Sequence, residues 1–247
     1  MKKLFAAAFF ILGISLLSGC SATKESTDMK GSQLSKHFSK VVKTRVNIDY
    51  LLYLPEEYGN DEKKWPLVLF LHGSGERGSD VNMVKRHGPP KLVERGKSFP
   101  FILVSPQCPD DQVWSIEGLD ALLNDLEAKY DVDQSRVYVT GLSMGGYATW
   151  KMAEAFPDRF AAIAPICGWS NVETVCSLKE LPIWVFHGKK DRAVPFERSV
   201  ELVDSLKKCG GNVQFTVYPD AGHDSWTETY NNPQLYEWML KQSRNNR

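Results

Sequence analysis

VYVTGLSMGG, residues 137–146, is the segment of this 247-residue chain that most strongly constrains its fold. Its first four residues have the composition of a buried strand, and a helical apolar pattern follows over residues 145–155. Between them stands the pattern G-x-S-x-G, with glycines two residues before and after Ser143. A sharp strand-to-helix turn strains the serine backbone and exposes its hydroxyl, and the glycines prevent clashes. The pattern alone occurs by chance, but this strand–turn–helix context predicts Ser143 as a nucleophile.

Strand-like apolar runs alternate with helical patterns on both sides of this turn. Strands are expected over residues 46–54, 66–71, 101–104, 136–140, 161–166, 182–186 and 213–218. Helices are expected over residues 116–129, 145–155, 196–208 and 234–242. This alternation predicts an α/β fold with a mostly parallel central sheet and helices on both faces. Because ligands of such sheets bind at the carboxyl ends of the strands, functional residues are expected directly after strands.

The nucleophile requires a base, because a free serine hydroxyl is a poor nucleophile at neutral pH. In folds with this turn the catalytic residues follow the chain order serine, acid, histidine. Three of the five histidines precede the nucleophile and are expected in other roles, namely His37, His72 and His87. His187 precedes the best acid candidate, whereas His223 lies in a loop after the last predicted strand. We therefore predict His223 as the base.

The acid should follow a strand that lies between the nucleophile and the base. Asp191 meets this requirement, because it comes directly after the predicted strand 182–186. Its expected role is to hold the imidazole in the productive tautomer and to stabilise the imidazolium. Asp220 and Asp224 are alternatives, but they lie too close in sequence to the histidine to come from a separate strand end. We expect them to be turn residues.

An oxyanion formed at this serine needs backbone N–H groups directed at the developing charge. Met144, the residue after the nucleophile, should supply one donor. The other should come from the loop after strand 66–71, where position favours Ser74. His72 opens that loop and is expected to shape it, and Glu76 and Arg77 are expected to make structural contacts within it.

The N-terminus has the organisation of an export signal. Lys2 and Lys3 precede an apolar run over residues 4–17, which is too short to span a bilayer comfortably. The run ends in the sequence Leu-Ser-Gly-Cys, which resembles the bacterial lipobox and predicts lipidation of Cys20. An ordinary cleaved signal with a chance cysteine is the alternative. A multiply acylated cysteine would anchor the protein firmly to a membrane.

The predicted organisation is a lipoprotein signal peptide over residues 1–19, a polar tether over residues 20–37 and a globular domain over residues 38–247. The predicted location is extracytoplasmic and membrane-anchored. Thirty basic residues balance thirty acidic ones, so no basic face for nucleic acid is indicated. The sequence does not indicate the oligomeric state.

Four further cysteines permit disulfides in such a compartment, and four cysteines allow three pairings. They are Cys108, Cys167, Cys176 and Cys209, and some of them could equally be free and buried. None of their spacings resembles a zinc site, and neither a metal nor an organic cofactor is expected.

Five blocks carry a family resemblance. They are HGSGERG (72–78), SPQCP (105–109), GLSMGGYATW (141–150), HGKKDRAVP (187–195) and GHDSWTETYNNPQLYEWML (222–240). Together they resemble the small bacterial carboxylesterases labelled predicted peptidases or phospholipase/carboxylesterase-like hydrolases, which are akin to feruloyl and acetylxylan esterases. The resemblance implies an α/β-hydrolase catalytic domain, a triad of Ser143, Asp191 and His223, and hydrolysis of carboxylic esters.

Three functions compete on this sequence. The first is a serine carboxylesterase that forms an acyl-enzyme, with acetyl or feruloyl esters on polysaccharides as the suggested substrates. The second is a peptidase of the prolyl-oligopeptidase type, which the absence of a large domain before residue 66 disfavours. The third is a non-catalytic, lipid-tethered binding protein, which the intact triad disfavours. The segment 167–181 is too short for a cap domain, and three tryptophans could form a substrate platform or pack in the core: Trp114, Trp169 and Trp226.

Overall fold

The computed structural model describes residues 45–59 and 62–246 of the chain, and Arg45–Arg247 is one compact unit. The predicted signal peptide, the tether and Cys20 lie outside the described residues, so the domain boundaries stay predictions. Within the described residues, no helix is both long and apolar enough to cross a membrane.

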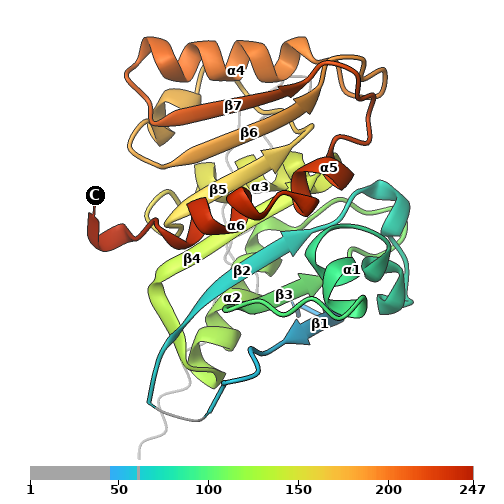
Figure 1. Ribbon diagram of the computed structural model, residues 1–247, viewed down its shortest axis with the longest axis vertical. Helices are drawn as coiled ribbons and strands as arrows, with labels where there is room; N and C mark the ends of the chain where they lie inside the picture. Colours follow the sequence, from blue (N-terminus) through green and yellow to red (C-terminus); the bar gives the residue numbers. More distant parts are fainter. Residues whose placement is uncertain (1–44, 60–61, 247) are drawn as a thin grey trace, which may run out of the picture. The chain divides into compact units, whose positions relative to one another are not determined.

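The described residues form one seven-stranded sheet with the order β1-β3-β2-β4-β5-β6-β7 (Figure 1). β1 pairs antiparallel with β3 at one edge, and every other neighbouring pair is parallel. The strands are β1 (Tyr50–Tyr53), β2 (Trp65–Leu71), β3 (Ile102–Pro106), β4 (Val132–Leu142), β5 (Ala162–Ile166), β6 (Ile183–Gly188) and β7 (Val213–Tyr218). This arrangement confirms the predicted, mostly parallel sheet.

Helices cover both faces of the sheet. Side chains of successive strand residues point to opposite faces, so apolar residues on both faces must be buried. On β2, Leu69 packs in a core cluster with Leu119 and Leu202, whereas its neighbour Phe70 packs in a second cluster with Leu235. The first face carries α2 (Ile116–Lys129), α3 (Met144–Ala155) and α4 (Glu197–Lys208). The second carries α1 (Gly88–Glu94), α5 (Trp226–Asn231) and α6 (Pro233–Leu240). The predicted α/β-hydrolase arrangement is confirmed.

The observed elements differ from the predicted ones where local pattern is weakest. The strand expected over residues 46–54 is limited to Tyr50–Tyr53, the residues that pair with β3. α1 and α5 were not predicted, because helices of seven and six residues are too short to show a periodic pattern. Asn232 caps α6 by accepting a hydrogen bond from the Gln234 N–H, and it separates α5 from α6.

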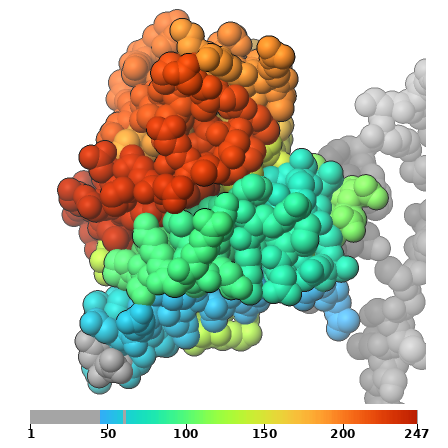
Figure 2. All heavy atoms as spheres, turned by 45° about the vertical axis from the view of Figure 1, so that its right-hand side comes forward, coloured from blue at the N-terminus to red at the C-terminus, as the bar shows by residue number. Residues whose placement is uncertain are grey.

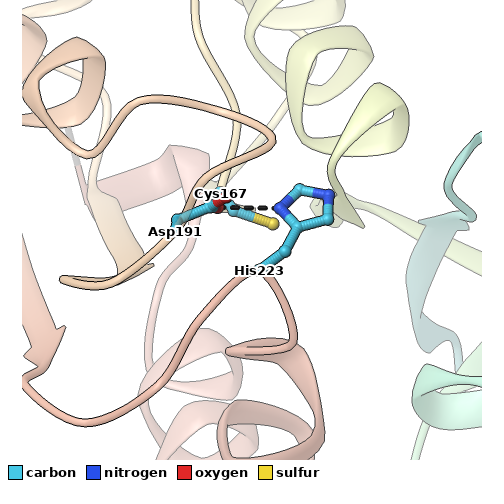
Figure 3. A group of neighbouring side chains, drawn as sticks. All are labelled: Cys167, Asp191 and His223. Carbon is cyan, nitrogen blue, oxygen red and sulfur yellow. Dashed lines mark hydrogen bonds and ion pairs between the residues drawn. The ribbon is translucent and has the colours of Figure 1, made fainter.

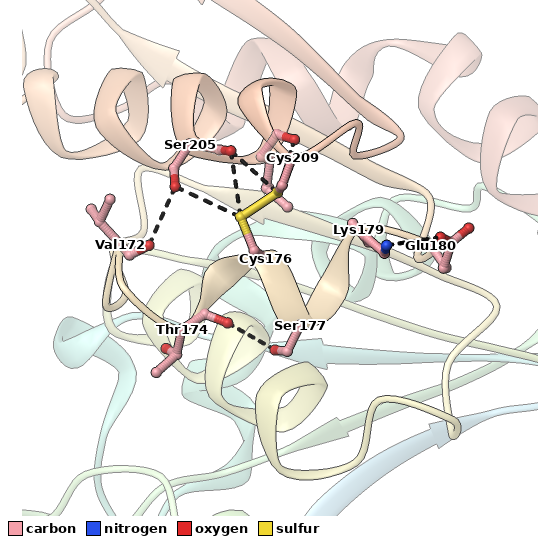
Figure 4. The surroundings of a disulfide bond; sticks show 9 residues. Val172, Thr174, Cys176, Ser177, Lys179, Glu180, Ser205 and Cys209 are labelled. Atoms are coloured by element: carbon pink, nitrogen blue, oxygen red, sulfur yellow. Dashed lines mark hydrogen bonds and ion pairs between the residues drawn. A yellow bond between two sulfur atoms is a disulfide. The ribbon is translucent and has the colours of Figure 1, made fainter.

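The connection between β5 and β6 contains a single short 3-10 helix, η3 (Val175–Leu178), rather than a cap domain. A disulfide joins Cys176 of this segment to Cys209 at the end of α4, with their Cα atoms 6.1 Å apart (Figure 4). Cys108 and Cys167 are buried free thiols. The bond closes a loop of 33 residues, which in the chain-entropy model stabilises the fold by about 3–4 kcal/mol. It ties the connection between β5 and β6 to the end of α4.

Candidate active site

Ser143 lies on the sharp turn between β4 and α3, with φ 54° and ψ −115°. This conformation is strained for a residue with a side chain, and it is held by the packing of the surrounding backbone. The Ser143 N–H donates to the carbonyl of Ile166 at the end of β5, at 3.0 Å. A Cβ atom at Gly145 would clash with the Leu71 carbonyl oxygen, and one at Gly141 would clash with the Gly145 carbonyl. The glycines of the motif are therefore required by close backbone approach.

The structure brings Ser143, His223 and Asp191 into one hydrogen-bonded row. His223 Nε2 lies 3.0 Å from Ser143 Oγ, and His223 Nδ1 lies 2.7 Å from Asp191 Oδ2. His223 comes from the loop between β7 and α5, and Asp191 from the loop between β6 and α4. The Asp191 side chain is fully buried, whereas 28% of the His223 side chain is exposed. The carboxylate therefore lies beneath the imidazole, which faces both the serine and solvent.

The surroundings of Asp191 keep its carboxyl group ionised. Burial by itself raises the pKa of this group, but hydrogen bonds from His223 and from the backbone N–H groups of Val194 and Ala193 outweigh it and lower the pKa. The two backbone donors lie 3.0 Å and 2.8 Å from Oδ1, respectively. The other carboxylate oxygen, Oδ2, therefore accepts the hydrogen bond from the His223 imidazole.

His187 is a partner of Asp191 that the sequence argument assigned no role. Its Nε2 lies 3.1 Å from Asp191 Oδ2 and 3.1 Å from the Val194 carbonyl oxygen, so this nitrogen carries a hydrogen. Its Nδ1 accepts from the Ser199 hydroxyl at 2.7 Å. Burial lowers the pKa of His187, which favours this neutral form. The position of His187 at the end of β6, four residues before Asp191, was the sequence feature that could have indicated this contact.

The alternative acids make other contacts. Asp224 accepts hydrogen bonds from the N–H and hydroxyl of Thr227, at 3.0 Å and 2.9 Å, and so caps the start of α5. Asp220 is exposed and pairs with Lys190 at 2.7 Å. Both are turn residues, in line with the sequence expectation.

The two expected oxyanion donors follow neighbouring strand ends. Met144 begins α3 and Ser74 begins the 3-10 helix η1 (Ser74–Glu76) after β2, and Leu71 of β2 is in register with Gly141 of β4. The loop after β2 also lies against the nucleophile turn, because a Cβ atom at Gly73 would come within 2.8 Å of the side chain of the β4 residue Leu142. Both residues therefore lie at the same edge of the sheet as Ser143, and their role as donors stays a prediction.

His72 is buried and shapes this loop, in line with the sequence expectation. Its Nδ1 donates to the Gly73 carbonyl at 2.6 Å, and its Nε2 accepts from the Cys108 N–H at 3.0 Å. Burial lowers its pKa to about 4, which keeps it neutral. Trp114 lies against its ring and donates to its carbonyl at 3.2 Å, so this tryptophan is a core residue.

The other two tryptophans are only partly buried and flank the candidate site. The Trp169 ring stacks on Tyr147 of α3 at 5.0 Å between centroids, and it also lines a hollow of about 170 Å³ with Val194 and Pro195. The Trp226 ring lies 5.1 Å from the ring of His223 in an edge-to-face contact. Both are therefore available to contact a substrate.

Cys167, Asp191 and His223 have potential metal-ligating atoms within 4.8 Å of one another (Figure 3). Burial raises the pKa of Cys167 to about 12, so without a bound metal its sulfur is a thiol. The other two residues are hydrogen-bonded to each other. The cluster is therefore a hydrogen-bonded carboxylate–imidazole pair beside a buried thiol.

A mostly parallel α/β sheet with a serine on a strand–helix turn, followed in sequence by its acid and then its histidine, defines the class of α/β-hydrolases. The model of the Dienelactone hydrolase family matches residues 97–238, more than half of the chain. The chain belongs to this family, and the prediction that it is a hydrolase is confirmed.

Several similar proteins carry esterase names. The chain is 27% identical over 190 residues to "Probable feruloyl esterase C" of Aspergillus clavatus, which covers 73% of this chain and 68% of that protein. It is 25% identical over 140 residues to the "Bifunctional acetylxylan esterase/xylanase XynS20E" of Neocallimastix patriciarum, covering 54% of this chain and 20% of that protein. A solved thermostable esterase has 37% sequence identity and a TM-score of 0.71, covering 81% of this chain and 60% of that one.

Proposed function

We propose that the chain is a serine carboxylesterase in which Ser143, His223 and Asp191 form the catalytic triad. The observation that carries the proposal is the continuous row of hydrogen bonds from the Ser143 hydroxyl through the imidazole to the buried carboxylate, at 3.0 Å and 2.7 Å. The membership of a hydrolase family and the esterase relatives support the same function.

In the proposed reaction, Ser143 Oγ attacks the ester carbonyl carbon while His223 Nε2 takes the hydroxyl proton. The carbonyl oxygen becomes an oxyanion, which accepts hydrogen bonds from the backbone N–H groups of Ser74 and Met144. His223 then gives its proton to the leaving alcohol, and the acyl group stays on Ser143. Water repeats the sequence with the same base, releasing the acid and the free serine.

We propose esters on plant-type polysaccharides, acetyl or feruloyl, as the substrates. The open connection between β5 and β6, which carries only η3, suits an ester on a bulky polymer. Trp169 supplies an aromatic surface beside the hollow near Val194, where a sugar or an aryl group could stack. The names of the fungal relatives point to the same ester types.

A substrate comparison on the full-length protein tests this proposal. We expect kcat/KM for acetylated xylan or feruloylated oligosaccharides to exceed the values for long-chain triglycerides and prolyl peptides. Triglyceride hydrolysis requires an extended apolar trough, and peptide hydrolysis requires a pocket that orients the chain. A preference of about tenfold or more for the lipid or the peptide, roughly 1.4 kcal/mol in transition-state binding, would contradict the polysaccharide assignment.

We also propose that the mature protein is extracytoplasmic and anchored through lipid on Cys20. The signal-like sequence of residues 1–19 motivates the proposal, and the Cys176–Cys209 disulfide supports it, because such bonds are typical of oxidising compartments.

The Cys20→Ser variant should no longer incorporate labelled palmitate and should move from the membrane fraction to the soluble fraction. The physical reason is the loss of acyl chains, each buried methylene of which contributes about 0.8 kcal/mol to membrane binding. Cys108→Ser, a change at a buried free cysteine, is the matched control and should stay in the membrane fraction. Unchanged fractionation of the Cys20→Ser variant would show that no lipid anchor exists at this position.

A further inference from the structure

A small pocket with basic side chains lies between α1 and α5. Its volume is about 50 Å³, and its lining includes His87, Lys91, Arg95, Trp226 and Thr227. Figure 2 shows the C-terminal helices, in red, lying against the teal to green segment that contains α1. A pocket of this size accommodates a carboxylate group or a few water molecules.

The charge of this pocket comes from α1 and the residue that follows it. Lys91 lies on α1 and Arg95 is the residue that follows its last turn, and both side chains line the pocket. Lys91 is half-buried and Arg95 is exposed, and within the described residues neither forms an ion pair with a carboxylate. Burial lowers the pKa of His87, so this residue is neutral and adds no charge. The pocket therefore offers two cations without a partner among the described residues.

Acidic groups near the pocket contact other residues. Glu76 Oε1 lies 3.5 Å from Nε2 of the pocket residue His87. Glu94 of α1 pairs with Lys85 at 3.0 Å. Asp224 acts on His87 through its charge, but both of its oxygens accept hydrogen bonds from Thr227. Lys91 and Arg95 line the pocket and neither Asp224 nor Glu76 does, so an anionic ligand in it would contact the two cations rather than a carboxylate.

Trp226 connects this pocket to the reaction centre. Its indole N–H donates to His87 Nδ1 at 3.3 Å on the pocket side, and its ring lies 5.1 Å from the His223 ring. In the proposed mechanism His223 gives its proton to the leaving alcohol, so the alcohol part of the ester lies on the histidine side of the site. The pocket is therefore placed to contact the alcohol part rather than the acyl part.

We propose that this pocket binds a negatively charged group, such as the carboxylate of an acidic sugar, on the alcohol part of the ester substrate. The proposal rests on the proposed esterase function and specifies acidic polymers as its substrate class. A carboxylate between Lys91 and Arg95 would accept charge-assisted hydrogen bonds, which are stronger than those between neutral groups.

Two synthetic acetyl esters test the proposal on the full-length protein. The alcohols are 3-(hydroxymethyl)benzoate and 3-(hydroxymethyl)benzamide, so the acyl group and the bond cleaved are the same and only one negative charge differs. We expect kcat/KM to favour the carboxylate ester. The preference should fall about tenfold in the Lys91→Gln/Arg95→Gln variant, and in the parent it should weaken between about 0.02 M and about 0.5 M NaCl because salt screens the attraction.

The Lys207→Gln/Lys208→Gln variant is the matched control. It removes the same charge from two exposed residues at the end of α4, on the opposite face of the sheet, and should keep the preference of the parent. A preference that is absent in the parent, unchanged in the α1 variant or equally lost in the control would overturn the pocket assignment. Hydrolysis of the neutral ester reports the esterase function separately. If the parent cleaves neither these esters nor a p-nitrophenyl ester, the esterase function fails and the pocket assignment with it.

Discussion

The Ser143→Ala variant is expected to hydrolyse a short p-nitrophenyl ester at least about a thousandfold more slowly than the parent, because no acyl-enzyme can form without the hydroxyl. The fold should survive, because alanine has the same Cβ atom as serine. The backbone strain at this turn is therefore unchanged, and the smaller side chain creates no clash. Initial rates and a thermal unfolding curve on the same preparation measure both effects.

Ser177→Ala provides a matched control for this change. Ser177 is an exposed residue of η3 whose hydroxyl donates to the Thr174 carbonyl, and it has no contact with the triad. Its loss should leave the hydrolysis rate within about twofold of the parent, as is usual for surface substitutions. If Ser143→Ala retained activity within about tenfold of the parent, Ser143 would not be the nucleophile.

The Asp191→Asn variant is expected to lose roughly three to four orders of magnitude in turnover. The structure supplies a specific reason. The N–H groups of Ala193 and Val194 both donate to Oδ1, so the amide oxygen of the new asparagine must take that position. Its NH2 group then faces the Nδ1 atom of His223, which must accept a hydrogen bond instead of donating one.

That reversal places the imidazole hydrogen on Nε2, the atom that faces the Ser143 hydroxyl. The histidine can no longer accept the serine proton, so the base is lost although its position is kept. The amide would also face the Nε2–H of His187, which adds an unfavourable contact between two donors. Turnover of the p-nitrophenyl ester, with KM determined separately, measures the effect.

Asp224→Asn is the control for the choice of acid. Asp224 contacts Thr227 at the start of α5 and does not bond to the imidazole. Asparagine is as good a helix cap as aspartate, so this variant should keep the fold and change turnover far less. A larger loss in Asp224→Asn than in Asp191→Asn would identify Asp224 as the acid.

Much of the fold could be predicted because the information was local. The strand over residues 213–218 and the helix over residues 116–129 have in the structure the bounds that the sequence predicted. Their apolar residues recur at the period of the element over enough residues to be recognised. α1 and α5 are too short for that, and they are held by contacts with the second core cluster and with each other.

The sequence by itself determined the order of Ser143, Asp191 and His223 and the strand end after which each one stands, because a parallel sheet brings the carboxyl ends of its strands to one edge. Only the tertiary structure decided which cysteines pair, that His187 contacts Asp191, and that Lys91 and Arg95 border a pocket next to Trp226. These contacts join residues whose relative positions depend on how loops and short helices pack. No local pattern encodes such distances, because they arise from the packing of the whole domain.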